Sequence, residues 1–162
     1  MARFDRYVLV AACLSTASCS VEPPEPSGSS STVSSLSSPL TTSGGLSDPT
    51  VTSKLRDVSL AVAARAGVSS PATMRAVAAS DHQKAETVIS GSIVEGHEPV
   101  YVVQMTGGSF NALHRPSAAP ETPHGDYLTI TFDQATLGIL DIGYDMVAPS
   151  LTKIDPTVVN MM

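Results

Sequence analysis

The side chains with the most obvious chemical potential are four histidines, His82, His97, His114 and His124. Zinc and related ions are usually held by closely spaced pairs, such as two histidines four residues apart on a helix, or by a cluster of cysteine and histidine. None of these spacings occurs in the chain. We therefore predict no metal site and no cofactor, and we expect these histidines to lie in solvated loops.

A serine nucleophile needs a strained turn with flanking glycines, together with a histidine and an acid within reach. The segment 107–111 reads Gly-Gly-Ser-Phe-Asn, with Asn111 where the last glycine of such a turn should stand. Its glycines are more typical of a strand that ends in a bulge or a tight bend. Asp133, Asp141 and Asp145 could supply paired carboxylates, but a turn cap and hairpin positions explain them better. We predict no catalytic residue.

The connection from Asn111 to Asp126 is the best candidate for a binding site. It carries Pro116, Pro120 and Pro123, which reduce the entropy that is lost when a loop is held in place. Connections of this length without secondary structure are usually either functional or disordered. The candidate binding residues are His114, Arg115, His124 and Asp126. The alternative is a poorly ordered insertion.

Cys19 is the one cysteine whose surroundings suggest a modification. Basic residues at positions 3 and 6 precede an apolar run over 7–14 and small residues over 15–18, which is the order found in a secretory signal peptide. The sequence Thr16-Ala17-Ser18-Cys19 is similar to a bacterial lipobox, in which the cysteine is lipidated and becomes the first residue of the mature protein. We expect a signal peptide over 1–18 and a lipid anchor at Cys19. Cleavage after Ala17, which would release a soluble product, is the alternative.

The composition excludes some classes of partner. The chain of 162 residues has a formal charge of −6, with 9 basic and 15 acidic side chains, so it lacks the basic surface that nucleic acid requires. It has two cysteines, of which Cys13 lies in the expected leader and Cys19 in the anchor. No cysteine is then left for a disulfide, and the domain must be stabilised by its own core.

A polar segment separates the expected anchor from the rest of the chain. From Ser20 to Pro49, 22 of 30 residues are Ser, Thr, Pro or Gly, and the few apolar residues follow no helical or strand period. Such a composition cannot bury enough apolar area to offset the entropy of ordering it. The sequence predicts a disordered tether over 19–48, with an end-to-end distance of about 30 Å, and one domain over 49–162.

The domain begins with a predicted helix. Asp48 can cap its first amides, Pro49 suits the first helical position, and Gly67 suits the residue just after its end. Apolar residues at 51, 55, 58 and 62 line one face of this helix. The next stretch is ambiguous: Ser70-Pro71 could start a second helix, or residues 73–79 could form a strand followed by a helix from Asp81 to Gly91. We prefer the strand.

After Pro99 the hydrophobic period changes to two, which predicts strands over 100–105, 127–133 and 138–142. A polar turn at 133–136 joins the last two strands as an antiparallel hairpin. The predicted fold is α+β: one long helix packed on a three- to four-stranded antiparallel sheet. The C-terminal residues 144–162, interrupted by Pro149 and Pro156, are expected to cover a sheet edge. An adhesive tail over 158–162 is the alternative.

The segments 100–107, 133–136 and 139–143 resemble uncharacterised secreted bacterial lipoproteins whose core is similar to the PepSY-type module. In that module an Asp-x-x-Thr-Gly turn joins two strands under a helix, and here Leu137 stands at the place of the turn glycine. The resemblance covers roughly residues 51–154. It implies a small non-catalytic domain outside the cytoplasm, with a role in protein binding or in restraining a peptidase.

The sequence as a whole predicts a binding or regulatory module that is lipid-anchored at the extracytoplasmic face of a bacterial membrane. An envelope protein is a possible partner. Two alternatives remain open: a small secreted hydrolase or metal-dependent enzyme centred on residues 111–126, and a purely structural envelope protein.

Overall fold

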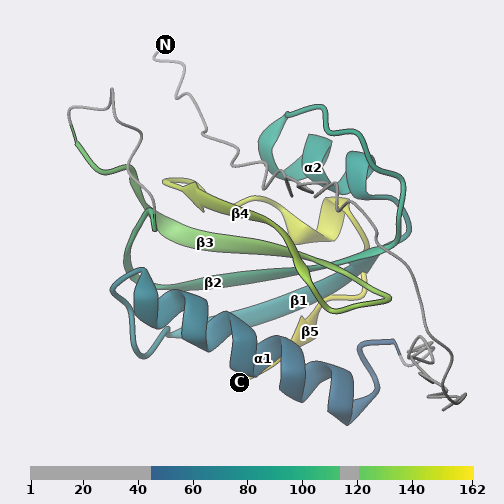
Figure 1. Ribbon diagram of the computed structural model, residues 1–162, viewed down its shortest axis with the longest axis horizontal. Helices are drawn as coiled ribbons and strands as arrows, with labels where there is room; N and C mark the ends of the chain where they lie inside the picture. Colours follow the sequence, from purple (N-terminus) through teal and green to yellow (C-terminus); the bar gives the residue numbers. More distant parts are fainter. Residues whose placement is uncertain (1–44, 114–120) are drawn as a thin grey trace, which may run out of the picture.

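The computed structural model describes residues 45–113 and 121–162. The predicted signal peptide (1–18), Cys19, most of the predicted tether (19–48), and the candidate binding residues His114 and Arg115 lie outside these ranges. In the described part, two helices and a short 3₁₀ turn, η1 (Leu151–Lys153), accompany a five-stranded antiparallel sheet (Figure 1).

The first helix, α1 (Pro49–Arg65), begins and ends as the sequence predicts. The Asp48 carboxylate accepts a hydrogen bond of 2.8 Å from the backbone N–H of Thr50. At the other end Gly67 has a φ of 98°, and its N–H and that of Val68 donate to the carbonyls of Ala64 and Ala63. This pair of bonds is a Schellman motif, which satisfies carbonyls that a helix end leaves without partners.

The ambiguous stretch after α1 is a strand followed by a helix, as we preferred. The strand is β1 (Thr73–Ala79) and the helix is α2 (His82–Ser90). Asp81 caps α2 by accepting from the backbone N–H of Lys84 at 2.8 Å, and Gly91, with a φ of 70°, ends it. The α+β fold is therefore confirmed, but the prediction of one long helix is wrong, because the domain has two shorter helices of 17 and 9 residues.

The sheet contains one strand more than we predicted. Its order is β4-β3-β2-β1-β5, with β2 at Val100–Asn111, β3 at His124–Asp133, β4 at Ile139–Asp145 and β5 at Val159–Asn160. The fifth strand, β5, pairs with Arg75 and Ala76 of β1 after η1 (Leu151–Lys153). The sequence did not reveal β5 because two residues are too few to show a period of two. Its position confirms that the C-terminal residues cover a sheet edge.

The strand β2 is also longer than predicted, since it does not end at its glycines. It continues to Asn111, and its pairing with β3 shifts register between Thr106 and Phe110, as expected for a bulge. Gly107 has a φ of 109°, and a side chain there would collide with Ala72. The glycines therefore let the segment after α1 lie against a bulged strand. Because β2 and β3 are both longer than predicted, the connection between them is shorter than the predicted one and comprises residues 112–123.

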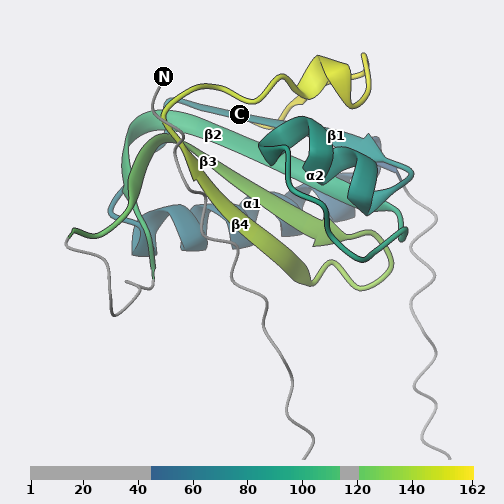
Figure 2. The ribbon, with the colours of Figure 1, turned by 90° about the horizontal axis from the view of Figure 1, so that it is seen from above.

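Two apolar cores lie on opposite faces of the sheet. On one face α1 packs on residues that include Tyr101, Val103 and Met105 of β2. On the other face α2 and η1 pack on the alternate residues Val100 and Val102. Because successive side chains of a strand point to opposite faces, this alternation places α1 and α2 on opposite sides of the sheet (Figure 2).

Candidate functional site

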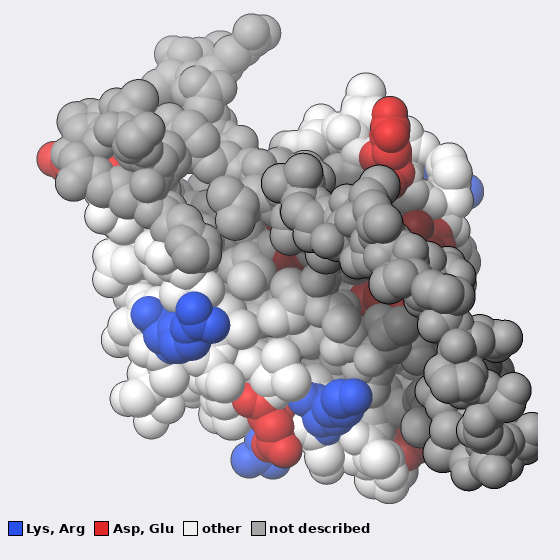
Figure 3. Space-filling model, in the orientation of Figure 1, with Lys and Arg blue, Asp and Glu red and all other residues white. Residues whose placement is uncertain are grey.

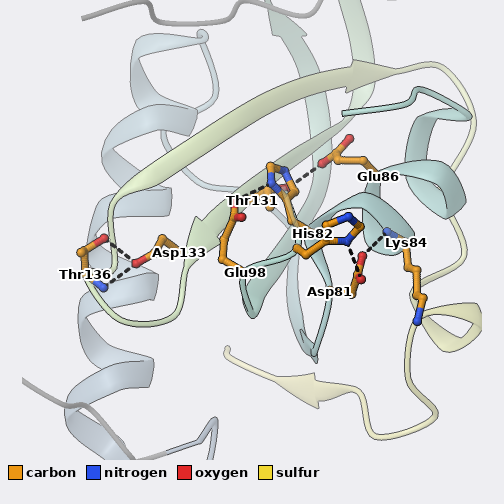
Figure 4. A network of polar contacts seen from close by, with 9 residues as sticks. Asp81, His82, Lys84, Glu86, Glu98, Thr131, Asp133 and Thr136 are labelled. Atoms are coloured by element: carbon orange, nitrogen blue, oxygen red, sulfur yellow. Dashed lines mark hydrogen bonds and ion pairs between the residues drawn. The ribbon is translucent and has the colours of Figure 1, made fainter. Parts of the chain in front are cut away.

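The most concentrated group of titratable side chains lies at the start of α2. Two pairs of neighbours, Asp81-His82 and His97-Glu98, face each other across the turn that leads into β2. His82 Nδ1 lies 2.8 Å from Glu98 Oε1, and His97 Nδ1 lies 2.9 Å from Asp81 Oδ2. Each acid is thus bonded to the imidazole of the opposite pair. We call these four residues the α2 clasp, and Figure 4 labels three of them, Asp81, His82 and Glu98.

Backbone hydrogen bonds reinforce the α2 clasp. The N–H of His82 donates to the carbonyl of Glu98 at 3.0 Å, and the N–H of Gln83 donates to the carbonyl of Gly96 at 2.9 Å. The next two amides of α2, at Lys84 and Ala85, donate to Asp81. All four amides at the helix start therefore have partners, and this helix end has no free N–H groups with which to bind an anion.

Hydrogen bonds lower the pKa values of the two carboxyl groups of the clasp. The backbone N–H of Lys84, followed by the ring of His97, lowers the pKa of Asp81 below its ordinary value. The pKa of Glu98 is lowered mainly by a hydrogen bond from its own backbone N–H, and the ring of His82 adds to the effect. Burial alone would raise both pKa values, so hydrogen bonding outweighs desolvation.

The imidazole of His82 is not placed for catalysis. Its side chain is 10% exposed, and Nε2 is enclosed without a hydrogen-bond partner among the described residues. A general base needs its free nitrogen within reach of a substrate proton. The geometry therefore indicates that this ring holds the loop before β2 against α2.

A buried carboxyl group lies one helical turn after the clasp. Glu86 is 1% exposed, and its Oε1 accepts a hydrogen bond of 2.8 Å from the hydroxyl of Thr131 on β3. This bond ties α2 to the centre of the sheet, on the face opposite α1 (Figure 4).

A cavity of about 510 Å³ opens beside the clasp. Its apolar wall is formed by small or aliphatic side chains from β1, α2 and the segment after η1. Its polar groups include Asp81, Lys84, Gln134 and Asp155. The Gln134 amide is fixed because its Nε2 donates to the carbonyl of Val100 at 2.9 Å. The Lys84 ammonium is exposed and forms no hydrogen bond or ion pair with any residue that the structure describes, although its charge helps to lower the pKa of Asp81.

The two predicted site residues that the structure describes, His124 and Asp126, lie elsewhere, at the far end of the β2–β3 hairpin. His124 and Asp126 are exposed on β3, two residues apart and hence on one face, whereas Gly125 between them is buried. The base of the connection is closed by a bond from the N–H of Ala112 to the carbonyl of Pro123. The N–H of Leu113 also donates to the Tyr144 hydroxyl at 3.3 Å. Whether His114 and Arg115 join this pair falls outside the described residues.

The expectation of solvated loop histidines is wrong for His82, which is buried in the first turn of α2. His97 fits it better, since its side chain is 72% exposed, although it is bonded to Asp81. The signal that could have revealed the clasp is the mirrored order of the two dipeptides, Asp-His at 81–82 and His-Glu at 97–98.

No group of three or more metal-ligating side chains comes together in residues 45–113 and 121–162. Within the same ranges, neither helix has the length and apolar character needed to cross a bilayer. Comparison of the chain with protein-family models, with curated proteins and with solved structures gives no match.

Proposed function

We propose that the protein is a lipid-anchored, extracytoplasmic binding module that holds a partner at the cavity beside α2. The observation that supports this proposal is the cavity itself. It combines an apolar wall with a few convergent polar groups, which is the usual character of a binding site. The α2 clasp lies at its edge and fixes the segments that form it.

The cavity chemistry suggests what the partner presents. Ala85, Pro99 and Ile154 can receive an apolar side chain, and the unpaired ammonium of Lys84 can bind a carboxylate. A segment of an envelope protein with an apolar residue next to an acidic one has both features. A regulatory role like that implied by the PepSY resemblance is compatible with such binding.

The decisive experiment places a photoreactive amino acid at one of two exposed serines in the full-length chain. Ser80 lines the cavity, and Ser70 lies in the segment before β1. Cross-linking in intact cells should give one saturable protein adduct from position 80, none from position 70, and at least tenfold less when Lys84→Glu is added. Equal labelling from both positions, or none from position 80, would show that the cavity is not the binding surface.

The anchor is tested separately, by mass spectrometry of the mature N-terminus. A diacylglyceryl-modified Cys19 as the first residue is the expected result. A mature chain that begins at Ser18 with an unmodified cysteine would contradict it.

Two further hypotheses remain predictions. One is a contact surface at residues 111–126, with His124 and Asp126 exposed at its β3 end. The other is a secreted hydrolase or metal-dependent enzyme at the same connection. The double variant Arg115→Ala/His124→Ala tests the first, because loss of partner binding is expected only where this end of the hairpin contacts the partner.

A further inference from the structure

The outward side of α1 is not covered by any other described element. Five residues of the helix are buried against the sheet: Val51, Leu55, Ser59, Val62 and Ala63. The opposite side presents small exposed residues, Ser53, Ala61 and Ala64, with Asp57 near its centre. Lys54 and Arg65 lie on one flank of this side and Arg56 on the other. This side of the helix is the open face of the domain in Figure 1.

Charge is distributed unevenly between α1 and the rest of the domain. The helix carries Lys54, Arg56 and Arg65, and Asp57 is its one acidic residue. The other described residues include only three more bases, Arg75, Lys84 and Lys153, but many acids. Those outside α1 and its cap are Asp81, Glu86, Glu95, Glu98, Glu121, Asp126, Asp133, Asp141, Asp145 and Asp155. Most of the blue side chains in Figure 3 accordingly gather along α1, next to a single red group.

The three cations of α1 are available to an external partner. All three are exposed, and none forms an ion pair or hydrogen bond with another residue that the structure describes. The chain has a net charge of −6. An anionic surface therefore attracts the basic residues of α1 and repels the rest of the domain. The same charge pattern orients the domain as well as attracting it.

The position of α1 in the chain favours a membrane as the anionic surface that it contacts. The helix starts at Pro49, directly after the predicted tether from Cys19, so it is the first helix or strand that the structure describes after the proposed anchor. A basic side chain close to an anionic bilayer contributes about 1 kcal/mol, which is too little to recruit a free protein through three residues. An anchor on a short tether raises the local concentration enough for such weak contacts to be occupied.

We propose that the exposed flank of α1 that carries Lys54, Ala61 and Arg65 docks on the anionic lipid surface, with Lys54 and Arg65 as the contacts. This proposal rests on the anchored form of the proposed function. Since α1 and α2 lie on opposite faces of the sheet, docking would turn the cavity beside α2 away from the membrane, where it can meet a partner.

The test uses a fluorescent reporter on the full-length chain, which contains no tryptophan of its own. One variant, Ala61→Trp, places the reporter on the exposed side of α1. A second, Ile93→Trp, places it after α2, at a residue that is 83% exposed. Each protein, lipidated at Cys19, is mixed with vesicles of phosphatidylglycerol and phosphatidylcholine. The acyl chains of these vesicles carry bromine, which quenches tryptophan at the membrane surface.

Quenching at position 61 should be at least twofold greater than at position 93. It should fall to the level of position 93 in about 0.5 M salt, at which charges are screened within a few ångströms. The substitution pair Lys54→Gln/Arg65→Gln should lower partitioning on the order of tenfold. The matched pair Arg75→Gln/Lys153→Gln removes the same charge away from α1 and should change partitioning by less than twofold.

Failure of docking can be told apart from failure of the anchor. Equal quenching at positions 61 and 93, or an equal effect of the two substitution pairs, overturns the docking surface even when Cys19 is lipidated. An unmodified Cys19 overturns the anchor, and with it the local concentration that such weak contacts need. Docking of α1 on an acidic protein in place of lipid would leave position 61 unquenched and would also overturn the proposal.

Discussion

At the scale of single residues, the domain contains polar groups of two opposite kinds. The side chains of the α2 clasp pair each acid with an imidazole and draw two chain segments together, although His82 Nε2 has no hydrogen-bond partner among the described residues. Other polar atoms are enclosed without a hydrogen-bond partner among the described residues, including Ser59 Oγ and Thr129 Oγ1. Buried polar groups stabilise a fold only when they are paired, and a buried group without a partner costs about 1–3 kcal/mol.

The clasp predicts how stability depends on pH. The pKa of Glu98 is lower in the folded protein than its ordinary value, so the unfolded chain binds more protons as the solution becomes acidic. Its contribution is therefore present above the ordinary carboxyl range, near pH 4, and is lost as the pH falls through the lowered pKa. Asp81 acts in the same direction. We expect Glu98→Gln to be less stable than the parent at pH 7 and to lose less stability between pH 5 and pH 3.

Urea unfolding at several pH values measures this effect. Glu95→Gln is the matched control, because Glu95 is an exposed glutamate of the same loop and lies outside the clasp. Parallel stability curves for Glu98→Gln and the parent protein would show that the clasp does not act through Glu98.

The second residue-scale prediction concerns Ser59, which is fully buried in the face of α1 that packs on the sheet. Ser59→Ala removes a hydroxyl without a hydrogen-bond partner, so it should raise the free energy of unfolding. Alanine is also the better helix former, and the exposed Ser53→Ala corrects for that difference. We expect Ser59→Ala to raise the free energy of unfolding by about 1 kcal/mol more than Ser53→Ala does, as measured by chemical denaturation. An equal gain would mean that the Ser59 hydroxyl is satisfied in solution.

At the scale of elements, the bulge in β2 decides how the segment after α1 meets the sheet. The N–H of Ala72 donates to the carbonyl of Thr106 at 2.7 Å, and that of Asn111 donates to the carbonyl of Ala66 at 2.8 Å. Gly107 and Gly108 lie between these bonds. A side chain at Gly108 would come within 2.6 Å of Val68, so both glycines leave room for the same segment.

Gly107→Ala should therefore be strongly destabilising. Its Cβ would lie 2.6 Å from Ala72 Cβ, and its φ of 109° is one that side chains rarely adopt. We expect a loss of about 3 kcal/mol or more, since clash and backbone strain act together. Gly91→Ala is the control: it also has a positive φ, of 70°, but nothing lies within 4 Å, so a loss of about 1 kcal/mol is expected. Thermal or urea unfolding of the two variants compares these effects, and equal losses would exclude the clash with Ala72.

At the scale of the whole molecule, the central strands β2 and β3 share the longest ladder and carry an apolar core on each face. The edges are protected differently. On one side β5 contributes two residues and is held by few bonds, one of them from the N–H of Met161 to the carbonyl of Met74. On the other side β4 is the last strand, and Ile139 and Leu140 at its start are partly exposed. Stability should therefore decrease from the centre of the sheet towards β5.

Hydrogen exchange measured by NMR tests this gradient. Amides of Val103 and Ile130 should exchange only through global unfolding, whereas those of β5 should exchange through local opening. We expect protection factors on the order of a hundredfold higher at the centre. Uniform protection across the five strands would indicate that β5 unfolds together with the core.

The sequence by itself determined the elements whose signals are local. Asp48, Pro49 and Gly67 define α1 because caps act within one helical turn, and Asp81 and Gly91 define α2 in the same way. The period of two after Pro99 placed the central strands because alternate burial repeats along a single strand. These local rules were enough for the α+β class. At 73–79 they left helix and strand open, and the strand was preferred because the strands after Pro99 need a partner in the sheet.

Tertiary structure alone decided what depends on contacts between distant segments. His82 and Glu98 are sixteen residues apart and meet only because β1, α2 and the turn before β2 fold back on one another. The cavity, the fifth strand and the continuation of β2 through its glycines likewise depend on neighbours that no sequence period encodes. Local patterns report what a residue does within its own element. The fold determines which element lies beside it, and therefore which polar groups are paired and which remain available to bind.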